Sequence, residues 1–392
     1  MDAPLFPDFN MYSTPLLILV LQGLLFGVLL LIRYWKERYT ADLLLGLVLI
    51  ITCWHRTTYT IGFMGWYDTF RNTKVNYYLV SLTLLMAPLL YFYVRSVTTS
   101  AFKIVRRDYY HLVPMVIYLL YRIALVVYDS SQPGYADTQN GLLMNGTHSE
   151  VVLPIVIALE NVWMVLYLAF TFQVYYQYKA KLTQYYSNTY QLELNWLRNF
   201  LFIYTFLFLY SLAQLAVNIL ISDLHWTQMW WYHFFSGLAI IYVGIKGYFT
   251  RTNTLADLEF NDVPSGYQPR STTDLSAKLY SQDVSTITDY FNKHKPYLQP
   301  DLNLKSLAGE LGYTTNQMSE IINTGFGQNF NDFVNTYRVN AVQQCIKEGQ
   351  HEDLSLVGIA MDCGFNSKAT FNRVFKKLTT VSPTEYARSI DK

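Results

Sequence analysis

The sequence predicts an all-α protein, in which a seven-transmembrane helical bundle is followed by a cytoplasmic all-helical domain. Two observations lead to this prediction. Apolar segments long enough to cross a membrane recur as far as Phe249 and then stop. Beyond residue 281, shorter segments have apolar residues at helical spacing, separated by glycines. The residues between, 251–280, contain Pro264, Ser265, Gly266, Pro269 and several Thr and Asn, which is typical of a linker. We therefore expect a membrane domain at 1–250, a linker at 251–280 and a second domain at 281–392.

The composition excludes several classes of site. The chain has 392 residues with a formal net charge of +1, which indicates neither an acidic nor a basic partner for the whole protein. Its three cysteines, Cys53, Cys345 and Cys363, are far apart, so their spacing indicates neither a disulfide framework nor a zinc site. We expect no cofactor. The N-terminus has acidic but no basic residues before its first apolar run, which argues against a cleaved signal peptide.

Seven segments are long and apolar enough to cross a hydrocarbon core about 30 Å thick, which requires about 20 helical residues. They are residues 15–32, 41–63, 76–96, 110–128, 152–176, 197–220 and 228–249. These spans lack the repeated glycine- or proline-interrupted helices that are typical of transporters.

Basic residues are concentrated in alternate connections between the spans. One side of the membrane has only Arg71 and Lys74. The connections on the other side, counted to the start of the linker, contain Arg33, Lys36, Arg38, Arg95, Lys103, Arg106, Arg107, Lys179, Lys181, Arg198, Lys246 and Arg251. Because positively charged loops stay in the cytoplasm, we expect the N-terminus outside and the C-terminal domain inside. The chain resembles bacterial proteins, so the expected location is the inner membrane.

Polar residues from five spans are expected to lie in one layer in the outer half of the bundle. Ionisable residues are costly in hydrocarbon and usually face the bundle interior. The layer consists of His55, Arg56, Arg122, Glu160, Asn161, Gln214, Asn218 and His233. Two interpretations are compatible with each other. Glu160 pairs with Arg122 or Arg56 and locks the bundle, or the layer lines a pocket for an unknown small-molecule or membrane-derived ligand.

The second domain shows two helix-turn-helix patterns, joined by a longer amphipathic helix from Phe330 to about Lys347. Glycines are expected to end helices, and Ser or Thr to cap the helices that follow. The predicted caps are Thr314 or Thr315, Ser355 and Ser367, and the predicted helix-ending glycines are Gly312, Gly349 and Gly364. Pro383 is expected to open a closing helix.

Three stretches identify this domain more closely: LAGELGYTTNQMSEIIN (307–323), FGQNFNDFVNTYRVNAV (326–342), and IAMDCGFNSKATFNRVFKK (359–377), which is followed closely by TTVSPTEYAR. Together they resemble the AraC-type DNA-binding domain, over residues 285–389. The resemblance implies two recognition helices on one protein unit. They would enter successive major-groove faces of double-stranded DNA, about one turn, roughly 34 Å, apart.

The residues that we expect to contact DNA lie in and just before the two predicted recognition helices. They are Thr315, Asn316, Gln317, Ser319, Asn366, Ser367, Lys368, Thr370, Arg373, Lys376 and Lys377. Asn and Gln side chains suit adenine edges, and Arg suits guanine. Residues 281–392 contain 11 Lys and Arg against 12 Asp and Glu, so the basic residues are local to the second recognition helix. A single domain should therefore bind weakly, and we expect a homodimer that raises its effective concentration.

These observations predict a membrane-integrated one-component transcription regulator. A stimulus in the bundle would shift the equilibrium between two states of different DNA affinity. One alternative is an integral-membrane enzyme or transporter with a regulatory DNA-binding tail. Another is a membrane tether whose spans sense nothing. The sequence shows no paired carboxylates, HExxH motif or Gly-rich phosphate loop that would support an enzyme.

Overall fold

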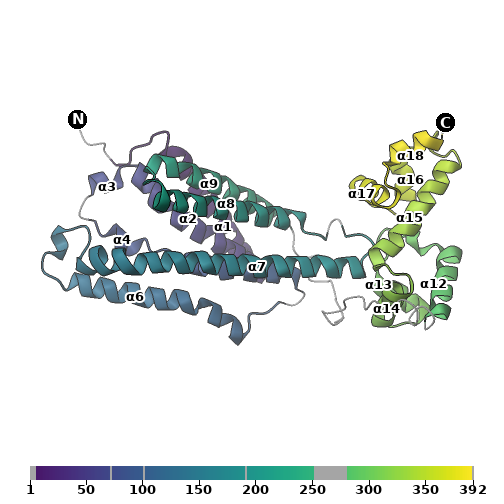
Figure 1. Cartoon of the computed structure of the whole chain (residues 1–392), viewed down its shortest axis with the longest axis horizontal. Coiled ribbons are helices and arrows are strands. Elements are labelled where there is room, and N and C mark those ends of the chain that lie inside the picture. The colour runs from purple at the N-terminus through teal and green to yellow at the C-terminus, as the bar shows by residue number, and fades with distance from the viewer. Residues whose placement is uncertain (1–5, 71–72, 100–101, 190–191, 251–279, 391–392) are drawn as a thin grey trace. The chain divides into compact units, whose positions relative to one another are not determined.

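The computed structural model describes residues 6–70, 73–99, 102–189, 192–250 and 280–390. Every regular element in these ranges is helical, which confirms the predicted all-α class (Figure 1). The described residues divide into an N-terminal unit, residues 6–175 and 195–250, and a C-terminal unit, residues 176–194 and 280–390. The predicted linker 251–280 lies, except for its last residue, outside the described residues, as do Arg71 and Arg251. Segment 176–194, which we expected in the membrane domain, belongs to the C-terminal unit.

The N-terminal unit is built from long helices joined by short helical turns. Its elements are α1 (Ser13–Glu37), α2 (Thr40–Phe63), α3 (Trp66–Thr69), α4 (Val75–Tyr78), α5 (Thr83–Thr98), α6 (Val113–Ser130), α7 (Leu153–Tyr185), α8 (Asn195–Leu220) and α9 (Trp226–Phe249). Residues 176–185 of α7 belong to the C-terminal unit. Among the described residues, six stretches are long and apolar enough to cross a membrane: Ser13–Glu37, Thr40–Phe63, Val75–Thr98, Arg106–Ser130, Met144–Tyr185 and Asn195–Leu220. Helix α9 forms where the seventh span was predicted but is not among the six. Its tryptophans, tyrosines and histidine lower its mean hydropathy, so the seventh span stays a prediction.

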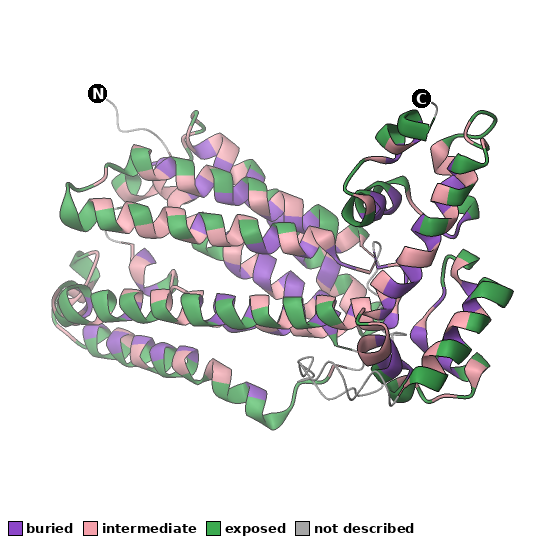
Figure 2. Cartoon of the chain, turned by 45° about the vertical axis from the view of Figure 1, so that its right-hand side comes forward, coloured by how far each residue is buried: buried purple, intermediate pink, exposed green. Residues whose placement is uncertain are grey.

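The outer faces of these helices are apolar and exposed (Figure 2). On α6 the side chains of Ile117, Leu120, Ile123 and Val127 are each 60–63% exposed, and they recur every three or four residues along one face. A water-soluble protein rarely exposes a continuous apolar surface of this kind. In a bilayer the same surface contacts lipid tails, as the predicted spans require.

Helix α9 lies parallel to α1, because successive contacts join residues of rising sequence number in both helices. At one end the Trp230 indole nitrogen donates to the backbone carbonyl of Tyr12 at 2.9 Å. Further along, the closely packed pairs are Leu19 with Gly237, Gly23 with Ile240, and Phe26 with Gly244. At the other end the Arg33 guanidinium donates to the carbonyls of Gly247 and Tyr248 and forms an ion pair with Asp42 at 2.5 Å. The two helices therefore run side by side over almost the full length of α1.

The third predicted span, residues 76–96, is interrupted rather than continuous. Helix α4 ends at Tyr78 and α5 begins at Thr83, so residues 79–82 are not helical. The Trp54 indole nitrogen donates to the Val80 carbonyl at 3.1 Å and satisfies part of the interrupted backbone. At membrane depth such backbone is tolerated only where protein or a cavity surrounds it. The third span, predicted as one segment, therefore contains a short non-helical break.

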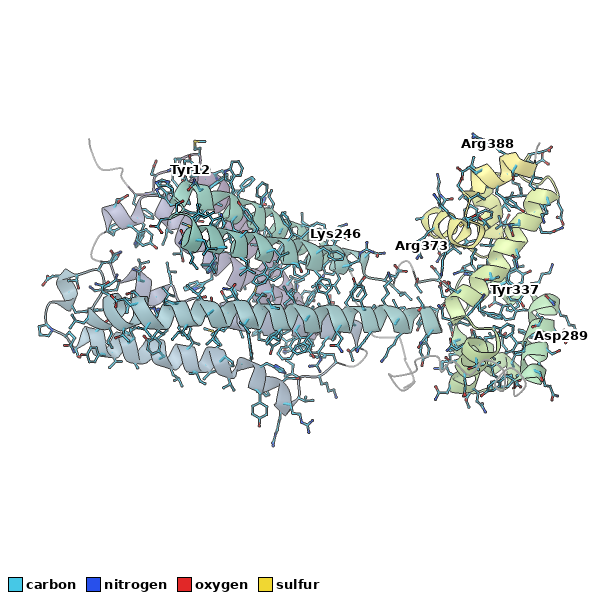
Figure 3. All side chains as sticks on the ribbon, in the orientation of Figure 1. Tyr12, Lys246, Asp289, Tyr337, Arg373 and Arg388 are labelled. Carbon is cyan, nitrogen blue, oxygen red and sulfur yellow. The ribbon has the colours of Figure 1, made fainter. Side chains whose placement is uncertain are left out.

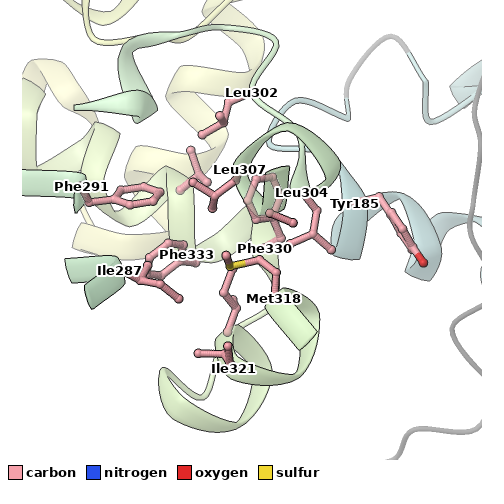
Figure 4. Packing of buried hydrophobic residues seen from close by; sticks show 13 residues of the cluster. Tyr185, Ile287, Phe291, Leu302, Leu304, Leu307, Met318, Ile321, Phe330 and Phe333 are labelled. Atoms are coloured by element: carbon pink, nitrogen blue, oxygen red, sulfur yellow. The ribbon is translucent and has the colours of Figure 1, made fainter. Parts of the chain in front are cut away.

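The C-terminal unit contains two small cores that share one helix. Its elements are α12 (Ser281–His294), α13 (Leu304–Leu311), α14 (Thr315–Gly325), α15 (Phe330–Lys347), α16 (Leu356–Asp362), α17 (Lys368–Thr379) and α18 (Pro383–Ile390). The first half of α15 contributes Phe330 and Phe333 to a core with α12, α13 and α14 (Figure 4). Its second half contributes Val342 and Ile346 to a core with α16, α17 and α18. The predicted long central helix thus connects two helical subdomains.

Candidate functional site

The first helix-turn-helix pair is α13 and α14, joined by a tight turn at Gly312. Gly312 has φ +76°, a left-handed conformation that glycine adopts without steric cost and that ends α13. Thr314 is the N-cap of α14, because its side-chain oxygen accepts from the Gln317 amide at 3.2 Å. Met318, Ile321 and Ile322 face the core. The predicted cap and turn are confirmed, and the position of α14 is set by local sequence.

The second pair, α16 and α17, is joined through Gly364, whose φ is +91°. A Cβ atom here would lie 2.2 Å from the Tyr297 carbonyl oxygen and 3.0 Å from Arg338 Nε. Only glycine fits this position, because both its conformation and its space exclude a side chain. Ser367 then caps α17 by accepting from the Thr370 amide at 3.2 Å. Phe371 and Phe375 hold α17 in the core.

Helix α17 presents a continuous exposed face that is mostly basic. The exposed residues of this face are Lys368, Ala369, Asn372, Arg373, Lys376 and Lys377, which follow the helical period along one side. Arg373 extends from this helix with 56% of its side chain exposed (Figure 3). Asn372 lies four residues after Lys368, and the sequence analysis did not include it, although the same spacing would have found it. Asn366, in the turn before α17, and the capping Ser367 are half-buried.

Two residues that we expected on the recognition surfaces are buried instead. Ser319 is 6% exposed and accepts from the Asn323 side-chain amide at 3.2 Å. Thr370 is 4% exposed, and its hydroxyl is bonded to Ser367 Oγ at 2.9 Å. Both lie on the inner side of their helices, where short polar side chains complete local hydrogen bonds. We therefore withdraw both from the exposed candidate set.

The exposed face of α14 is polar but has no basic residue. It contains Asn316, Gln317 and Glu320, with Thr315 half-buried beside them. The side-chain carbonyl oxygen of Gln317 accepts from the Thr314 backbone amide at 2.9 Å and so forms part of the cap. A bidentate contact between Gln317 and an adenine would have to break that bond. Asn316 is therefore the better placed of the two amides for reading a base.

The N-terminal unit encloses a cavity of ≈ 390 Å³. It is lined by residues of α2, α5, α7, α8 and α9, together with Leu82 just before α5 and Leu224 in the connection between α8 and α9. Of the eight polar residues predicted for one layer, seven line this cavity: His55, Arg56, Glu160, Asn161, Gln214, Asn218 and His233. Leu82 and Thr83, beside the interruption of the third span, line it too.

Arg56 is the buried cation of the cavity. It is 6% exposed and donates to Ser236 Oγ at 3.0 Å and to the Thr52 carbonyl at 2.8 Å. Among the described residues no carboxylate forms an ion pair with it. His233 is 3% exposed, packs on the Tyr59 ring at 3.6 Å between centroids, and has its Nδ1 without a hydrogen-bond partner within the described part of the chain. A buried charge with no countercharge is costly, so Arg56 is suited to an anionic group.

The predicted ion pair between Glu160 and an arginine is not formed in this structure. Glu160 accepts from the Ser81 hydroxyl at 2.7 Å. Arg122 does not line the cavity, and it bonds to His148 Nε2 at 2.9 Å and to the Asn76 carbonyl at 2.5 Å. The reason is the helix break at 79–82, which frees Ser81 to bond Glu160, together with the π-helical turn Met144–Val152, which supplies His148. The lock interpretation is wrong as we stated it.

The family match lies within the C-terminal unit. The family model described as "Helix-turn-helix domain" matches residues 307–389. An uncharacterized HTH-type transcriptional regulator of Staphylococcus aureus (strain COL) is 28% identical over 120 residues, which are 31% of this chain and 15% of the relative. Its counterpart in strain MSSA476 has the same identity and coverage. The probable transcription factor PqrA of Proteus vulgaris is 28% identical over 85 residues, 22% of this chain and 67% of the relative.

The chain therefore spans only about 15% of the length of the Staphylococcus aureus relatives. No solved structure matches it. The family match covers α14 to α17 and most of α13 and α18, the same helices that form the two helix-turn-helix pairs. The C-terminal unit thus contains an AraC-type helix-turn-helix domain, and this domain belongs to a chain with six helical stretches that are long and apolar enough to cross a membrane.

Proposed function

We propose that the protein is a membrane-integrated one-component transcription regulator that binds promoter DNA with both helix-turn-helix pairs. The observation that carries this proposal is the exposed basic face of α17 in a domain that is linked, in one chain, to six candidate spans. Lysine and arginine on a helix of this type suit the phosphates and guanine edges of the major groove. The weakly charged α14 would add contacts to adenine through Asn316. Binding as a homodimer would compensate for the small basic surface.

The parallel packing of α9 on α1 supports a seventh span. If α1 crosses the membrane, a helix that lies along its whole length crosses it in the same direction. The chain then leaves the membrane after α9 on the side where Arg33 and Lys36 lie. Because basic residues mark the cytoplasmic side, the helix-turn-helix domain faces the cytoplasm, and the N-terminus lies outside the inner membrane.

The cavity of the N-terminal unit is the proposed site of the stimulus. Its walls combine apolar side chains with a few polar groups, as in other small-molecule sites. The nearby helix break supports this role, because interrupted helices at membrane depth commonly border binding sites. Arg56 has no carboxylate partner among the described residues, so the proposed ligand is an amphipathic molecule with an anionic group.

We expect octanoate to stabilise the detergent-solubilised protein against thermal unfolding more than octanol does, because only the carboxylate can pair with Arg56. Arg56→Gln should abolish this difference. Arg122→Gln removes an arginine that does not line the cavity and serves as the matched control. Equal stabilisation by octanoate and octanol in the wild-type protein, or a preference that survives Arg56→Gln, would contradict the anion site.

Sequence-specific DNA binding can be tested with a duplex that the full-length protein, held in lipid nanodiscs, selects from a random-sequence pool. We expect Arg373→Ala to weaken binding to that duplex by about 1–3 kcal/mol, as the loss of one base contact does. Arg388→Ala removes the same charge from the exposed side of α18 and should have a much smaller effect. Binding would be measured by fluorescence anisotropy at one fixed salt concentration. Failure of the protein to enrich any sequence would refute the proposed function.

A further inference from the structure

The chain between α7 and α8 is bound to the helix-turn-helix domain. We call its described residues, 186–189 and 192–194, the docking segment. The Ser187 amide donates to the Leu302 carbonyl at 3.2 Å, and the Ser187 hydroxyl donates to the same carbonyl at 2.6 Å. The Asn331 side-chain amide donates to the Ser187 carbonyl at 2.8 Å. These bonds attach the segment to the connection before α13 and to the first turn of α15.

Arg338 of α15 ties the docking segment to the connection between α12 and α13. Its guanidinium, 1% exposed, donates to Ser187 Oγ at 3.1 Å, to the Tyr297 carbonyl at 2.8 Å and to the Gln299 carbonyl at 2.7 Å. Burial lowers the pKa of Arg338 to about 10, so it remains charged at neutral pH. A buried cation needs such acceptors, and Ser187 is one of them. The docking segment is therefore an integral part of the folded domain.

The docking segment is also covalently continuous with a helix of the cavity. Helix α7 contributes Glu160 and Asn161 to the cavity lining and ends at Tyr185. Tyr185 is 5% exposed and belongs to the core formed by Leu304 and Phe330 (Figure 4). At about 1.5 Å per residue, this 33-residue helix is about 50 Å long, which exceeds a hydrocarbon core of about 30 Å. Part of α7 therefore extends beyond a hydrocarbon core of that thickness.

Glu193, near the end of the docking segment, faces the recognition helix α17. Its side chain is 7% exposed and accepts from the Thr189 hydroxyl at 2.7 Å. It lies 3.9 Å from Lys179 Nζ and 3.7 Å from Arg373 Nη2. The largely buried carboxylate of Glu193 thus forms an ion pair with Arg373, the one arginine on the exposed face of α17.

We propose that the docking segment competes with DNA for Arg373. In the docked state Glu193 neutralises Arg373 and brings a negative charge to the surface that approaches phosphates. A guanidinium that contacts a guanine edge needs its two outer nitrogens, so it cannot keep the same ion pair. Displacement of the segment through α7 releases Arg373 and raises DNA affinity. This inference rests on the proposed function, because it presupposes that α17 binds DNA.

The test uses the full-length protein in nanodiscs and a duplex obtained by parallel selections with the wild type and Glu193→Gln. We expect Glu193→Gln to tighten binding to that duplex about fivefold, the effect of losing one partly exposed ion pair. Glu348→Gln removes the same charge from an exposed position after α15 and is the control for net charge. It should change affinity much less.

The same substitution is then made in an Arg373→Ala background, which completes a double-mutant cycle. If Glu193 acts through Arg373, Glu193→Gln should no longer exceed the Glu348→Gln control. The competition is overturned if Glu193→Gln weakens binding, leaves it unchanged, or tightens it equally with and without Arg373. If neither selection enriches a sequence, the proposed function fails instead.

Discussion

Replacing Phe371 with Ala is expected to unfold the subdomain formed by the second half of α15 with α16, α17 and α18. Phe371 is 1% exposed and packs against the rings of Phe365 and Phe375, with centroids 5.4 and 5.6 Å away. Removal of a buried aromatic side chain costs about 3–5 kcal/mol, from the lost burial and the cavity that remains. A small domain has only about 5–15 kcal/mol of stability in total.

Hydrogen exchange of the full-length protein in detergent, followed by mass spectrometry, would measure this effect. We expect amides of α16 and α17 to lose protection while those of α12 and α13, which pack in the other core, keep most of theirs. Asn372→Ala changes the neighbouring exposed residue and should alter stability by no more than about 0.5 kcal/mol. Wild-type protection of α17 in Phe371→Ala would show that this core does not hold the recognition helix.

Replacing Gly364 with Ala is expected to destabilise the same subdomain through the backbone. Its φ of +91° costs about 1–3 kcal/mol for a residue with a side chain. The new Cβ would also lie 2.2 Å from the Tyr297 carbonyl oxygen, which cannot move without disturbing the bonds of Arg338. We therefore expect a loss near or above the upper end of that range.

The matched control for this substitution is Gly309→Ala in α13. A Cβ at Gly309 would meet no atom within 4 Å, and its φ is not positive. Alanine there should be neutral or stabilising by up to about 1 kcal/mol, because glycine is a poor helix former. Hydrogen exchange of α16 and α17 would separate the two variants. If Gly364→Ala protects these helices as well as Gly309→Ala does, the steric argument for Gly364 is wrong.

The sequence by itself determined the elements of the helix-turn-helix domain. The predicted caps Thr314, Ser355 and Ser367 each accept the expected backbone hydrogen bond. The three predicted helix-ending glycines, Gly312, Gly349 and Gly364, all have positive φ. These features depend on interactions within four residues, which a local pattern records completely. The long apolar helices of the N-terminal unit could likewise be located from their length and composition.

The hydrogen-bond partners of the polar residues in the N-terminal unit were decided by tertiary structure. The cost of ionisable residues in hydrocarbon indicated that Arg56 and Glu160 face the bundle interior, but it could not show which groups they meet there. The interruption of the third span places Ser81 within hydrogen-bond distance of Glu160. The turn before α7 places His148 within hydrogen-bond distance of Arg122. Such pairs join residues tens of positions apart, and their geometry depends on helix rotations that the sequence pattern leaves open.

The contacts of the docking segment could likewise not be predicted from the sequence. Ser187 and Glu193 lie in a short polar connection that reads as an ordinary cytoplasmic loop. Their partners Arg338 and Arg373 are 151 and 180 positions away along the chain. Local pattern determines which residues form a helix and which side of it is apolar. Only the folded chain determines which exposed arginine meets which distant carboxylate, because that depends on contacts between elements rather than within them.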